Sequence, residues 1–183
     1  MRYDPLGKDL ALVVIDVQRK YMLREDGTPK WDGSGVDRIN ELSRMFRDAG
    51  RPVVFVRFMG CRDHCAYQGD DGDDLVEGVD VREGDLFVPK GNMNSFLDSD
   101  LEAVVRGAGC NGILLAGTVS NMCVLATYFG AFDRGLTSYI AEGACMSGRT
   151  EVDRAVELIC KKLTLEDVRG YLAGEPMVGP DPW

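Results

Sequence analysis

The sequence predicts an α/β fold of three layers (α/β/α), in which a central, mostly parallel sheet of five to six strands lies between two layers of helices. Short, continuous apolar runs alternate along the chain with segments whose apolar residues recur at helical spacing. The connections are short, as in sheets whose parallel strands are joined by crossover helices. We expect a single domain over residues 1–183, because a chain of this length buries about 70% of its surface in one core.

Five apolar runs are predicted to form the strands. The first, residues 10–15, has the sequence Leu-Ala-Leu-Val-Val-Ile and ends before Asp16, which is typical of a strand buried on both faces of a parallel sheet. The other four predicted strands are residues 53–56, 86–88, 112–116 and 137–141.

Four segments are predicted to be helices from the spacing of their apolar residues. In the first, Val36, Ile39, Leu42 and Phe46 share one face, and Gly50 follows as a helix stop. The four predicted helices are residues 36–49, 97–108, 121–132 and 150–162. A long irregular segment, residues 59–84, is rich in glycine and aspartate and too long for a plain connection, so we expect a lid or a binding loop there.

The net charge of the chain limits the kinds of partner that it can bind. The chain has 21 Lys and Arg against 30 Asp and Glu, a net charge of −9, which argues against nucleic acid or an anionic membrane. No apolar run reaches the roughly 18 to 20 residues of a membrane helix. Asp4 and Pro5 stand where a signal peptide would be apolar. We therefore expect a cytoplasmic protein that binds a small molecule and keeps most of its six cysteines reduced.

The ends of the predicted strands hold the candidate functional residues, since ligands bind beyond the carboxyl ends of such sheets. The candidates are Asp16, residues 57–61, Lys90, residues 117–123 and residues 142–147. This set contains a carboxylate, an amine and a thiol, which the fold can bring together although they lie far apart in the sequence.

Cys123 lies in the first turn of the predicted helix 121–132, where unpaired backbone N–H groups and the helix dipole favour a thiolate. Lys90 would add a positive charge, and Asp16 could hold that lysine or accept the thiol proton. The N–H groups of Val119 and Cys123 are candidates for an oxyanion hole, a contribution of about 3 to 4 kcal/mol per donor. Taken singly, Asp16 also fits a strand-end cap, Lys90 a solvated loop residue and Cys123 a small buried apolar residue.

At this point the sequence resembles the isochorismatase-like cysteine hydrolases, the family that contains nicotinamidases, N-carbamoylsarcosine amidases and related ureido-compound hydrolases. The resemblance extends from about residue 10 to residue 162. Its motifs are Val-Ile-Asp-Val-Gln at 14–18, Lys90 with Phe96, Leu101 with Gly109, Ala-Gly-Thr-Val-Ser-Asn-Met-Cys-Val at 116–124, and Gly135. Each motif alone is weak, but the ordered set at matching spacing is specific.

The resemblance implies a Rossmann-like fold and a triad in which Asp16 is the general base, Lys90 stabilises the thiolate and Cys123 is the nucleophile. It also implies a cis peptide bond between Thr118 and Val119. The implied reaction is attack of the Cys123 thiolate on an amide, carbamoyl or ureido carbonyl, loss of ammonia or an amine, and hydrolysis of the thioester. A homo-oligomer (dimer or tetramer), in which a neighbouring subunit completes the pocket, is also implied.

Four further residues are candidates for substrate binding. Gln18 can orient the substrate or bond to backbone near Asp16. Tyr21 and Phe96 can form an aromatic wall or pack in the core. Thr118, before the implied cis bond, is the fourth.

No metal and no cofactor are expected. The nicotinamidases of the family carry an Asp-x-His pair and a second histidine, whereas this chain has a single histidine, His64. Cys61, His64 and Cys65 lack the fourth ligand that a closed zinc site requires.

Three alternatives to an amidohydrolase remain open. The first is an isochorismatase-type hydrolysis of a vinyl ether, against which the presence of Cys123 counts. The second is a non-catalytic binding domain with the same fold, which would carry a broken triad. The third is a redox module that forms a reversible disulfide between Cys61 and Cys65.

Overall fold

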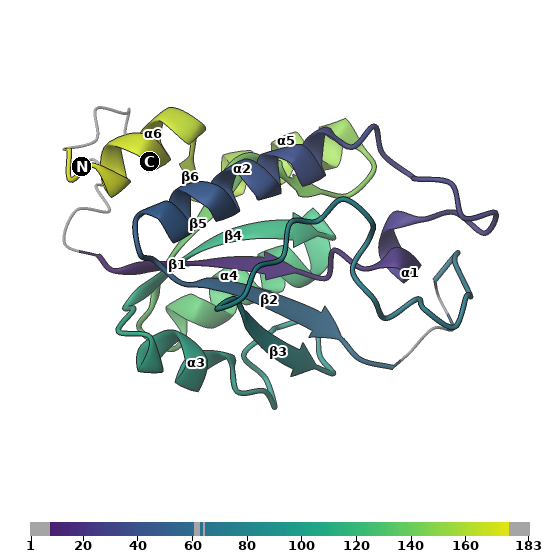
Figure 1. Cartoon of the computed structure of the whole chain (residues 1–183), viewed down its shortest axis with the longest axis horizontal. Coiled ribbons are helices and arrows are strands. Elements are labelled where there is room, and N and C mark those ends of the chain that lie inside the picture. The colour runs from purple at the N-terminus through teal and green to yellow at the C-terminus, as the bar shows by residue number, and fades with distance from the viewer. Residues whose placement is uncertain (1–7, 61–62, 64, 176–183) are drawn as a thin grey trace.

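The computed structural model describes residues 8–60, 63 and 65–175. Its centre is a six-stranded sheet in the order β3-β2-β1-β4-β5-β6, in which every pair of neighbours is parallel (Figure 1). The strands are β1 (Leu10–Ile15), β2 (Val53–Phe58), β3 (Leu86–Lys90), β4 (Gly112–Thr118), β5 (Thr137–Met146) and β6 (Lys162–Leu163). The predicted α/β class and parallel sheet are confirmed. In the view of Figure 1 the strands point to the right, toward α1.

Helices cover both faces of the sheet. They are α1 (Arg19–Met22), α2 (Ser34–Asp48), α3 (Leu101–Gly107), α4 (Leu125–Phe132), α5 (Thr150–Ile159) and α6 (Leu165–Leu172), with a π-helical turn over Ser120–Val124. Apolar residues of α2 and α6 pack in one buried cluster, and those of α3, α4 and α5 pack in another. The sheet therefore separates two hydrophobic cores, as the predicted three layers require.

The central strand β1 shows why its sequence is apolar without interruption. All six of its residues are buried. Leu10, Leu12 and Val14 belong to the core beneath α2 and α6, whereas the alternate residues Ala11 and Val13 belong to the core of α3, α4 and α5. Because successive side chains point to opposite faces, a strand between two helical layers needs apolar residues at every position.

The predicted helix 150–162 is too long by three residues. The helix ends at Ile159, and Cys160 adopts an extended backbone (φ −96°, ψ 154°). Residues 162–163 then form β6, in which Leu163 pairs with Ala141 of β5 and is buried. Burial of Leu163 at the edge of the sheet outweighs the helical spacing of the preceding residues. The predicted helix 97–108 is similarly shortened, because Asp98 has φ +52° and the helix begins at Leu101.

Helix α6 was not predicted from the apolar pattern, although its start carries a recognisable signal. The Thr164 side chain accepts a hydrogen bond from the N–H of Asp167 (3.1 Å), and the Asp167 carboxylate accepts one from the N–H of Thr164 (2.8 Å). This reciprocal pair is a capping box, which satisfies two backbone donors at a helix start. The Thr-x-x-Asp spacing was the sequence feature that could have indicated the helix.

The strand β3 extends through Pro89 to Lys90, two residues beyond its predicted end. It is an edge strand that pairs with β2 alone. An edge position tolerates proline, which has no N–H to donate to a second neighbour. The extension matters for function because it makes Lys90 the last residue of the strand.

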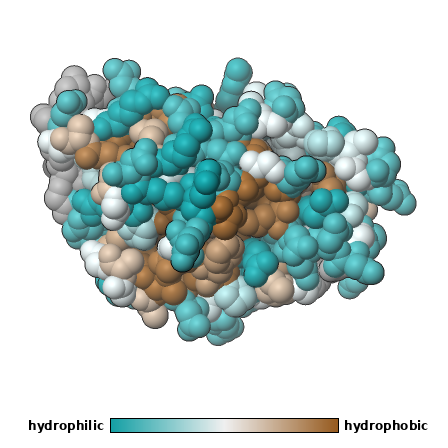
Figure 2. All heavy atoms as spheres, viewed as in Figure 1, coloured by the Kyte–Doolittle hydropathy of each residue, from teal (hydrophilic) through white to brown (hydrophobic). Residues whose placement is uncertain are grey.

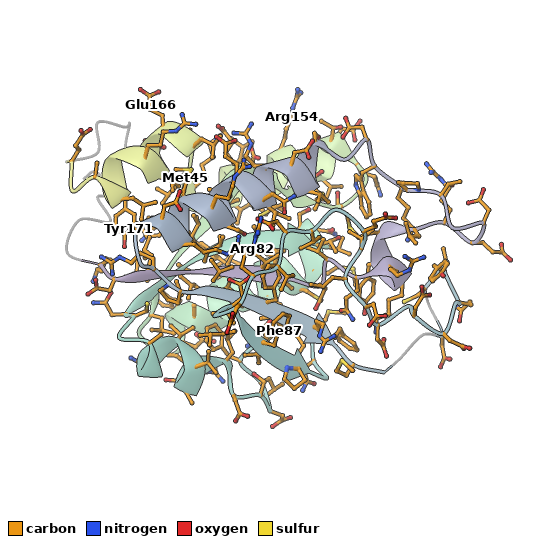
Figure 3. All side chains as sticks on the ribbon, in the orientation of Figure 1. Met45, Arg82, Phe87, Arg154, Glu166 and Tyr171 are labelled. Atoms are coloured by element: carbon orange, nitrogen blue, oxygen red, sulfur yellow. The ribbon has the colours of Figure 1, made fainter. Side chains whose placement is uncertain are left out.

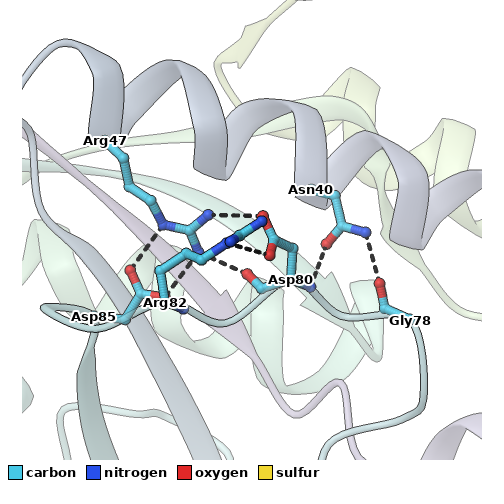
Figure 4. A network of polar contacts seen from close by, with 6 residues as sticks. All are labelled: Asn40, Arg47, Gly78, Asp80, Arg82 and Asp85. Atoms are coloured by element: carbon cyan, nitrogen blue, oxygen red, sulfur yellow. Dashed lines mark hydrogen bonds and ion pairs between the residues drawn. The ribbon is translucent and has the colours of Figure 1, made fainter.

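The irregular segment before β3 is fastened to α2 by a polar network, shown in Figure 4. Arg47 binds the carboxylate of Asp85 through Nε and Nη2 (2.9 and 2.7 Å) and the carbonyl oxygen of Asp80 (2.6 Å). Asn40 accepts a hydrogen bond from the N–H of Asp80 (2.8 Å) and donates one to the carbonyl of Gly78 (2.7 Å). Bidentate contacts of this kind fix position as well as charge, so this part of the segment has a defined course.

The surface is polar over most of the face shown in Figure 2, with hydrophobic residues gathered in its middle and lower part. Phe87 of β3, labelled in Figure 3, is 44% exposed and stacks on Phe55 of β2 (ring centroids 5.6 Å apart). Arg154 of α5 and Glu166 of α6, also labelled there, are exposed charged residues. Among the described residues, no helix combines the length and the apolar character that a membrane crossing needs.

The capping box of α6 gives a test of this part of the fold. Replacement Thr164→Ala removes the acceptor for the Asp167 N–H, so we expect the free energy of unfolding to fall by about 1 kcal/mol. Urea denaturation measures the change. Thr164→Ser retains the hydroxyl and should lose much less, and equal losses in both variants would contradict the proposed cap.

Candidate active site

A buried ion pair lies at the carboxyl edge of the sheet. Asp16 follows β1 and Lys90 ends β3, and Lys90 Nζ lies 2.8 Å from Asp16 Oδ2. Both side chains are almost completely buried. Lys90 also donates to the carbonyl oxygen of Met93 (3.2 Å) and lies 5.5 Å from the centre of the Phe58 ring. The fold thus brings two of the three predicted catalytic groups into direct contact.

The third predicted group, Cys123, lies in the π-helical turn between β4 and α4. Its thiol interacts with both Asp16 and Lys90, and it lines the same cavity as Asp16. The turn begins where the N–H groups of Met122 and Val124 donate to the carbonyl of Val119 (3.0 and 3.3 Å). The helix expected over 121–132 is therefore present, but its first turn is widened around the cysteine.

Glycine at position 117 allows the end of β4 to approach the end of β1. Gly117 has φ +116°, and a Cβ atom there would lie 2.1 Å from the carbonyl oxygen of Ile15. The peptide bond that follows Thr118 is cis. Thr118 lines the cavity, and its hydroxyl donates to the carbonyl of Met146 (3.1 Å). Asp16 and the residues after β4 consequently face one another across a short gap.

The electrostatics of the thiol differ from the sequence-based expectation. Burial and the neighbouring Asp16 carboxylate raise the pKa of Cys123 to about 12, and Lys90 only partly opposes this. Burial also raises the pKa of Asp16 above its ordinary value. The Lys90 ammonium acts in the opposite direction and offsets this shift only in part. We expected the helix start and Lys90 to stabilise a thiolate, but desolvation raises the pKa by more than Lys90 lowers it. The resting thiol is therefore protonated at neutral pH.

A cavity of about 640 Å³ opens above these residues, within the range of small-molecule sites. Tyr21, Trp31, Phe58 and Met122 supply much of its apolar wall. The remaining lining residues are Asp16, Lys20, Lys30, Cys65, Gly91, Asn92, Met93, Thr118, Val119, Cys123, Ser147 and Gly148. Cavity, ion pair and thiol thus form one site at the carboxyl ends of β1, β3, β4 and β5, where the topology places ligands.

Of the four predicted substrate-binding residues, Tyr21 and Thr118 line the cavity, whereas Gln18 and Phe96 lie outside its wall. The Gln18 amide donates to the carbonyls of Phe58 (3.1 Å) and Asp73 (2.8 Å), and it accepts from the N–H of Phe58 (2.8 Å). Gln18 therefore makes the backbone contacts that were its alternative role.

Phe96 is buried in the core of α3, α4 and α5, with the Arg134 guanidinium 5.2 Å from its ring centre. The aromatic partner of Tyr21 is Phe58, whose ring meets it edge to face at 6.4 Å. The aromatic wall exists, but Phe58 takes the place expected for Phe96. Phe58 falls within the candidate range 57–61 after the predicted second strand, and that strand extends by two residues so that it ends at Phe58.

Three lining residues that sequence reasoning missed are Lys20, Lys30 and Trp31. Lys20 is fully buried and donates to the carbonyls of Phe58 (2.7 Å) and Gly60 (3.1 Å), besides its ion pair with Asp73 (2.6 Å). These residues follow β1 in a segment without helical or strand periodicity, so the apolar pattern carried no signal for them. The proximity of Lys20 to Asp16 in the sequence was the available indication.

The possible metal ligands of the loop are only partly described. Cys61 and His64 lie outside the described residues, while Cys65 lines the cavity. Within the described residues, no three His, Cys, Asp or Glu side chains gather as a metal site would require.

Fold and site together define an α/β protein with a cavity of small-molecule size beyond the carboxyl ends of a parallel sheet. Residues 10–159 match the model of the isochorismatase domain. The chain therefore belongs to the isochorismatase family, whose members are generally hydrolases.

Individual relatives are distant. The isochorismatase family protein YddQ of Bacillus subtilis is 26% identical over 145 residues, which cover 78% of this chain and 81% of YddQ. Ureidoacrylate amidohydrolase RutB of Serratia proteamaculans is 26% identical over 106 residues, which cover 58% of this chain and 37% of that enzyme. The structure of N-carbamoylsarcosine amidase from Thermoplasma acidophilum superposes with a TM-score of 0.68 and 22% identity, covering 85% of this chain and 95% of that one.

The buried ion pair can be tested without reference to any reaction. Lys90→Met leaves the Asp16 carboxylate buried without its cation, so we expect the free energy of unfolding to fall by about 3–5 kcal/mol. The double variant Asp16→Asn/Lys90→Met has no unpaired charge and should recover part of the loss. As a control, Lys162→Met removes a partly exposed ion pair with Glu142 and should cost no more than about 1 kcal/mol. If the loss of unfolding free energy in the double variant equals the sum of the losses in Lys90→Met and Asp16→Asn, the two charges are not coupled.

The raised pKa of Cys123 predicts a protonated thiol throughout the neutral range. The difference in thiolate absorbance at 240 nm between the wild type and Cys123→Ala should therefore stay flat as pH rises from 6 to 9, because the pKa is about 12. The subtraction removes the contribution of the other thiols. Appearance of thiolate absorbance below pH 9 would show that Lys90, and not burial, controls the thiol.

Proposed function

We propose that this protein hydrolyses a C–N bond in a small amide, carbamoyl or ureido compound, with Cys123 as the nucleophile. The observation that carries the proposal is the contact of the Cys123 thiol with the Lys90–Asp16 ion pair, at the wall of a cavity that Cys123 and Asp16 line. Burial of a carboxylate and an ammonium carries a desolvation penalty, and such groups often occur at functional sites. The contact of this pair with a thiol is consistent with a catalytic role.

The first half of the reaction forms a thioester. The Asp16 carboxylate accepts the proton of the Cys123 thiol as sulfur attacks the carbonyl carbon, so no stable thiolate is needed beforehand. The tetrahedral oxyanion accepts hydrogen bonds from the N–H groups of Val119 and Cys123, two residues that line the cavity. Collapse of this intermediate breaks the C–N bond, and Asp16 returns the proton to the leaving nitrogen.

The second half regenerates the thiol. A water molecule loses a proton to Asp16 and attacks the thioester carbon, and the C–S bond then breaks with return of the proton to sulfur. The products are a carboxylic or carbamic acid and the free Cys123 thiol. In both halves the ammonium of Lys90 favours the carboxylate form of Asp16 and so opposes the rise in the Asp16 pKa that burial causes, which leaves a group able both to accept and to return a proton.

The relatives support this choice of bond. One is named an amidohydrolase of ureidoacrylate, and a structural neighbour is named an amidase of N-carbamoylsarcosine. Both names describe hydrolysis at a carbonyl that is bonded to nitrogen, which is the chemistry that a thiol nucleophile beside an acid–base residue performs.

The experiment is ammonia release from a panel of small amides and ureido compounds. We expect turnover by the wild type and a loss of at least about a thousandfold in Cys123→Ala, since the nucleophile is absent. Cys110→Ala is the matched control, because Cys110 is also buried but precedes β4 at the opposite end of the sheet. It should keep most of the activity.

Other results would point elsewhere. Equal turnover in the wild type and Cys123→Ala would exclude Cys123 as the nucleophile. Absence of ammonia release together with cleavage of a vinyl ether would favour the isochorismatase-type reaction. Ligand binding without either reaction would favour a non-catalytic domain.

A further inference from the structure

Among the described residues that line the cavity, every charged side chain but one is paired with a side chain of opposite charge. Asp16 is paired with Lys90 (2.8 Å), and Lys20 is paired with Asp73 (2.6 Å). The third charged residue in the described wall is Lys30. Among the described residues, no carboxylate lies within ion-pair distance of its ammonium. The described part of the wall therefore carries a net positive charge in a protein whose overall charge is −9.

Lys20 and Lys30 differ in how their donors are used. An ammonium has three N–H donors, and those of Lys20 are matched by Phe58, Gly60 and Asp73. All three N–H donors of Lys20 are therefore in use, and they fix the end of β2 and the segment that contains Gly60 and Asp73. Lys30 Nζ donates to the backbone carbonyl of Tyr21 (2.8 Å), which is its one acceptor among the described residues and is neutral. That bond aims the ammonium without neutralising it.

The surroundings of Lys30 disfavour an isolated cation. The residue is half-buried, and burial lowers its pKa; the nearby Cys65 thiol opposes this shift in part, and the positive charge of Arg24 adds slightly to it. A cation held in such a place is stabilised by an anion that enters the cavity, because the ligand restores the charge partner that the protein lacks. A lysine on an open surface would gain little from the same contact.

The other residues of the cavity wall indicate the shape and polarity of the ligand. Next to Lys30 in the sequence, Trp31 lines the cavity, and Tyr21 and Phe58 form an edge-to-face pair in the same wall. Aromatic and thioether surfaces favour a flat or apolar molecular body, and the volume of about 640 Å³ admits a small molecule rather than a polymer.

We propose that Lys30 is the anion-binding residue of this cavity and that it selects substrates that bear a carboxylate in addition to the scissile carbonyl. The selection of a reacting substrate rests on the proposed function, because the carbonyl must meet Cys123. Binding of the anion does not rest on it. The ammonium of Lys30 donates two charge-assisted hydrogen bonds to the carboxylate while it keeps its bond to Tyr21.

The test compares two carboxylates with their neutral methyl esters: ureidoacetate and 4-carbamoylbenzoate. Isothermal titration uses the full chain carrying Cys123→Ser, so that the probes are not consumed. We expect each carboxylate to bind more tightly than its ester. Addition of Lys30→Met should weaken carboxylate binding about 10- to 100-fold and change ester binding by less than about threefold.

Two control variants accompany this measurement. Lys8→Met makes the same change in net charge at an exposed residue before β1, at the other end of the sheet, and should leave both affinities unchanged. Lys30→Arg keeps the cation and should retain the preference for the carboxylate, which separates loss of charge from misfolding.

The proposal is overturned if neither carboxylate binds, if Lys30→Met weakens acid and ester equally, or if Lys8→Met has the same effect as Lys30→Met. These outcomes are distinct from failure of the proposed reaction. A protein that prefers carboxylates through Lys30 but releases no ammonia from any amide would retain the binding inference and lose the hydrolytic one. If turnover occurs but does not depend on the charge of Lys30, the hydrolytic proposal is retained and the selection of carboxylate substrates by Lys30 is lost.

Discussion

The buried ion pair between Lys90 and Asp16 constrains the whole carboxyl edge of the sheet. Lys90 ends β3 and Asp16 follows β1; these strands are not neighbours, so the pair reaches across the end of β2. Phe58, the last residue of β2, lies beside the ammonium. Two charges at this depth are tolerated only when they remain in contact, so the ends of three strands must keep their relative positions. The edge strand is thereby tied to the centre of the sheet.

The second constraint is the close approach of β4 to β1. These two central strands mark the switch point of the 3-2-1-4-5-6 order, where crossover connections leave in opposite directions and open a crevice. Gly117 permits the approach, and a hydrogen bond from Ser120 to Asp153 of α5 (2.6 Å) fixes the turn that carries Cys123. The crevice is therefore bounded by backbone contacts on one side and by the ion pair on the other.

The sequence predicted the parts of the fold that follow from periodicity and burial. The strand at residues 10–15 was located to the residue, because a strand buried on both faces has no polar position to blur its ends. Cys123 and Lys90 could be placed at one edge because all strands of such a sheet point the same way. The wall residues Lys30 and Trp31 were not predictable, since they occupy irregular backbone whose course is set by contacts distant in sequence. The π-helical turn and the raised pKa of the thiol also depend on packing between distant segments, which no local sequence pattern encodes.

Two groups of ion pairs fasten the later part of the segment before β3. Arg19 and Lys20 hold Asp71 and Asp73, and Arg47 holds Asp80 and Asp85. Of the described residues of this segment, only Cys65 reaches the cavity, and it precedes both fastenings. Substitution of Cys65 alters the cavity wall, and Cys65 belongs to neither hydrophobic core and to neither group of ion pairs. Selection can therefore retune what the cavity accepts in small steps that are nearly neutral for folding, and divergence of substrate among descendants need not await compensating mutations.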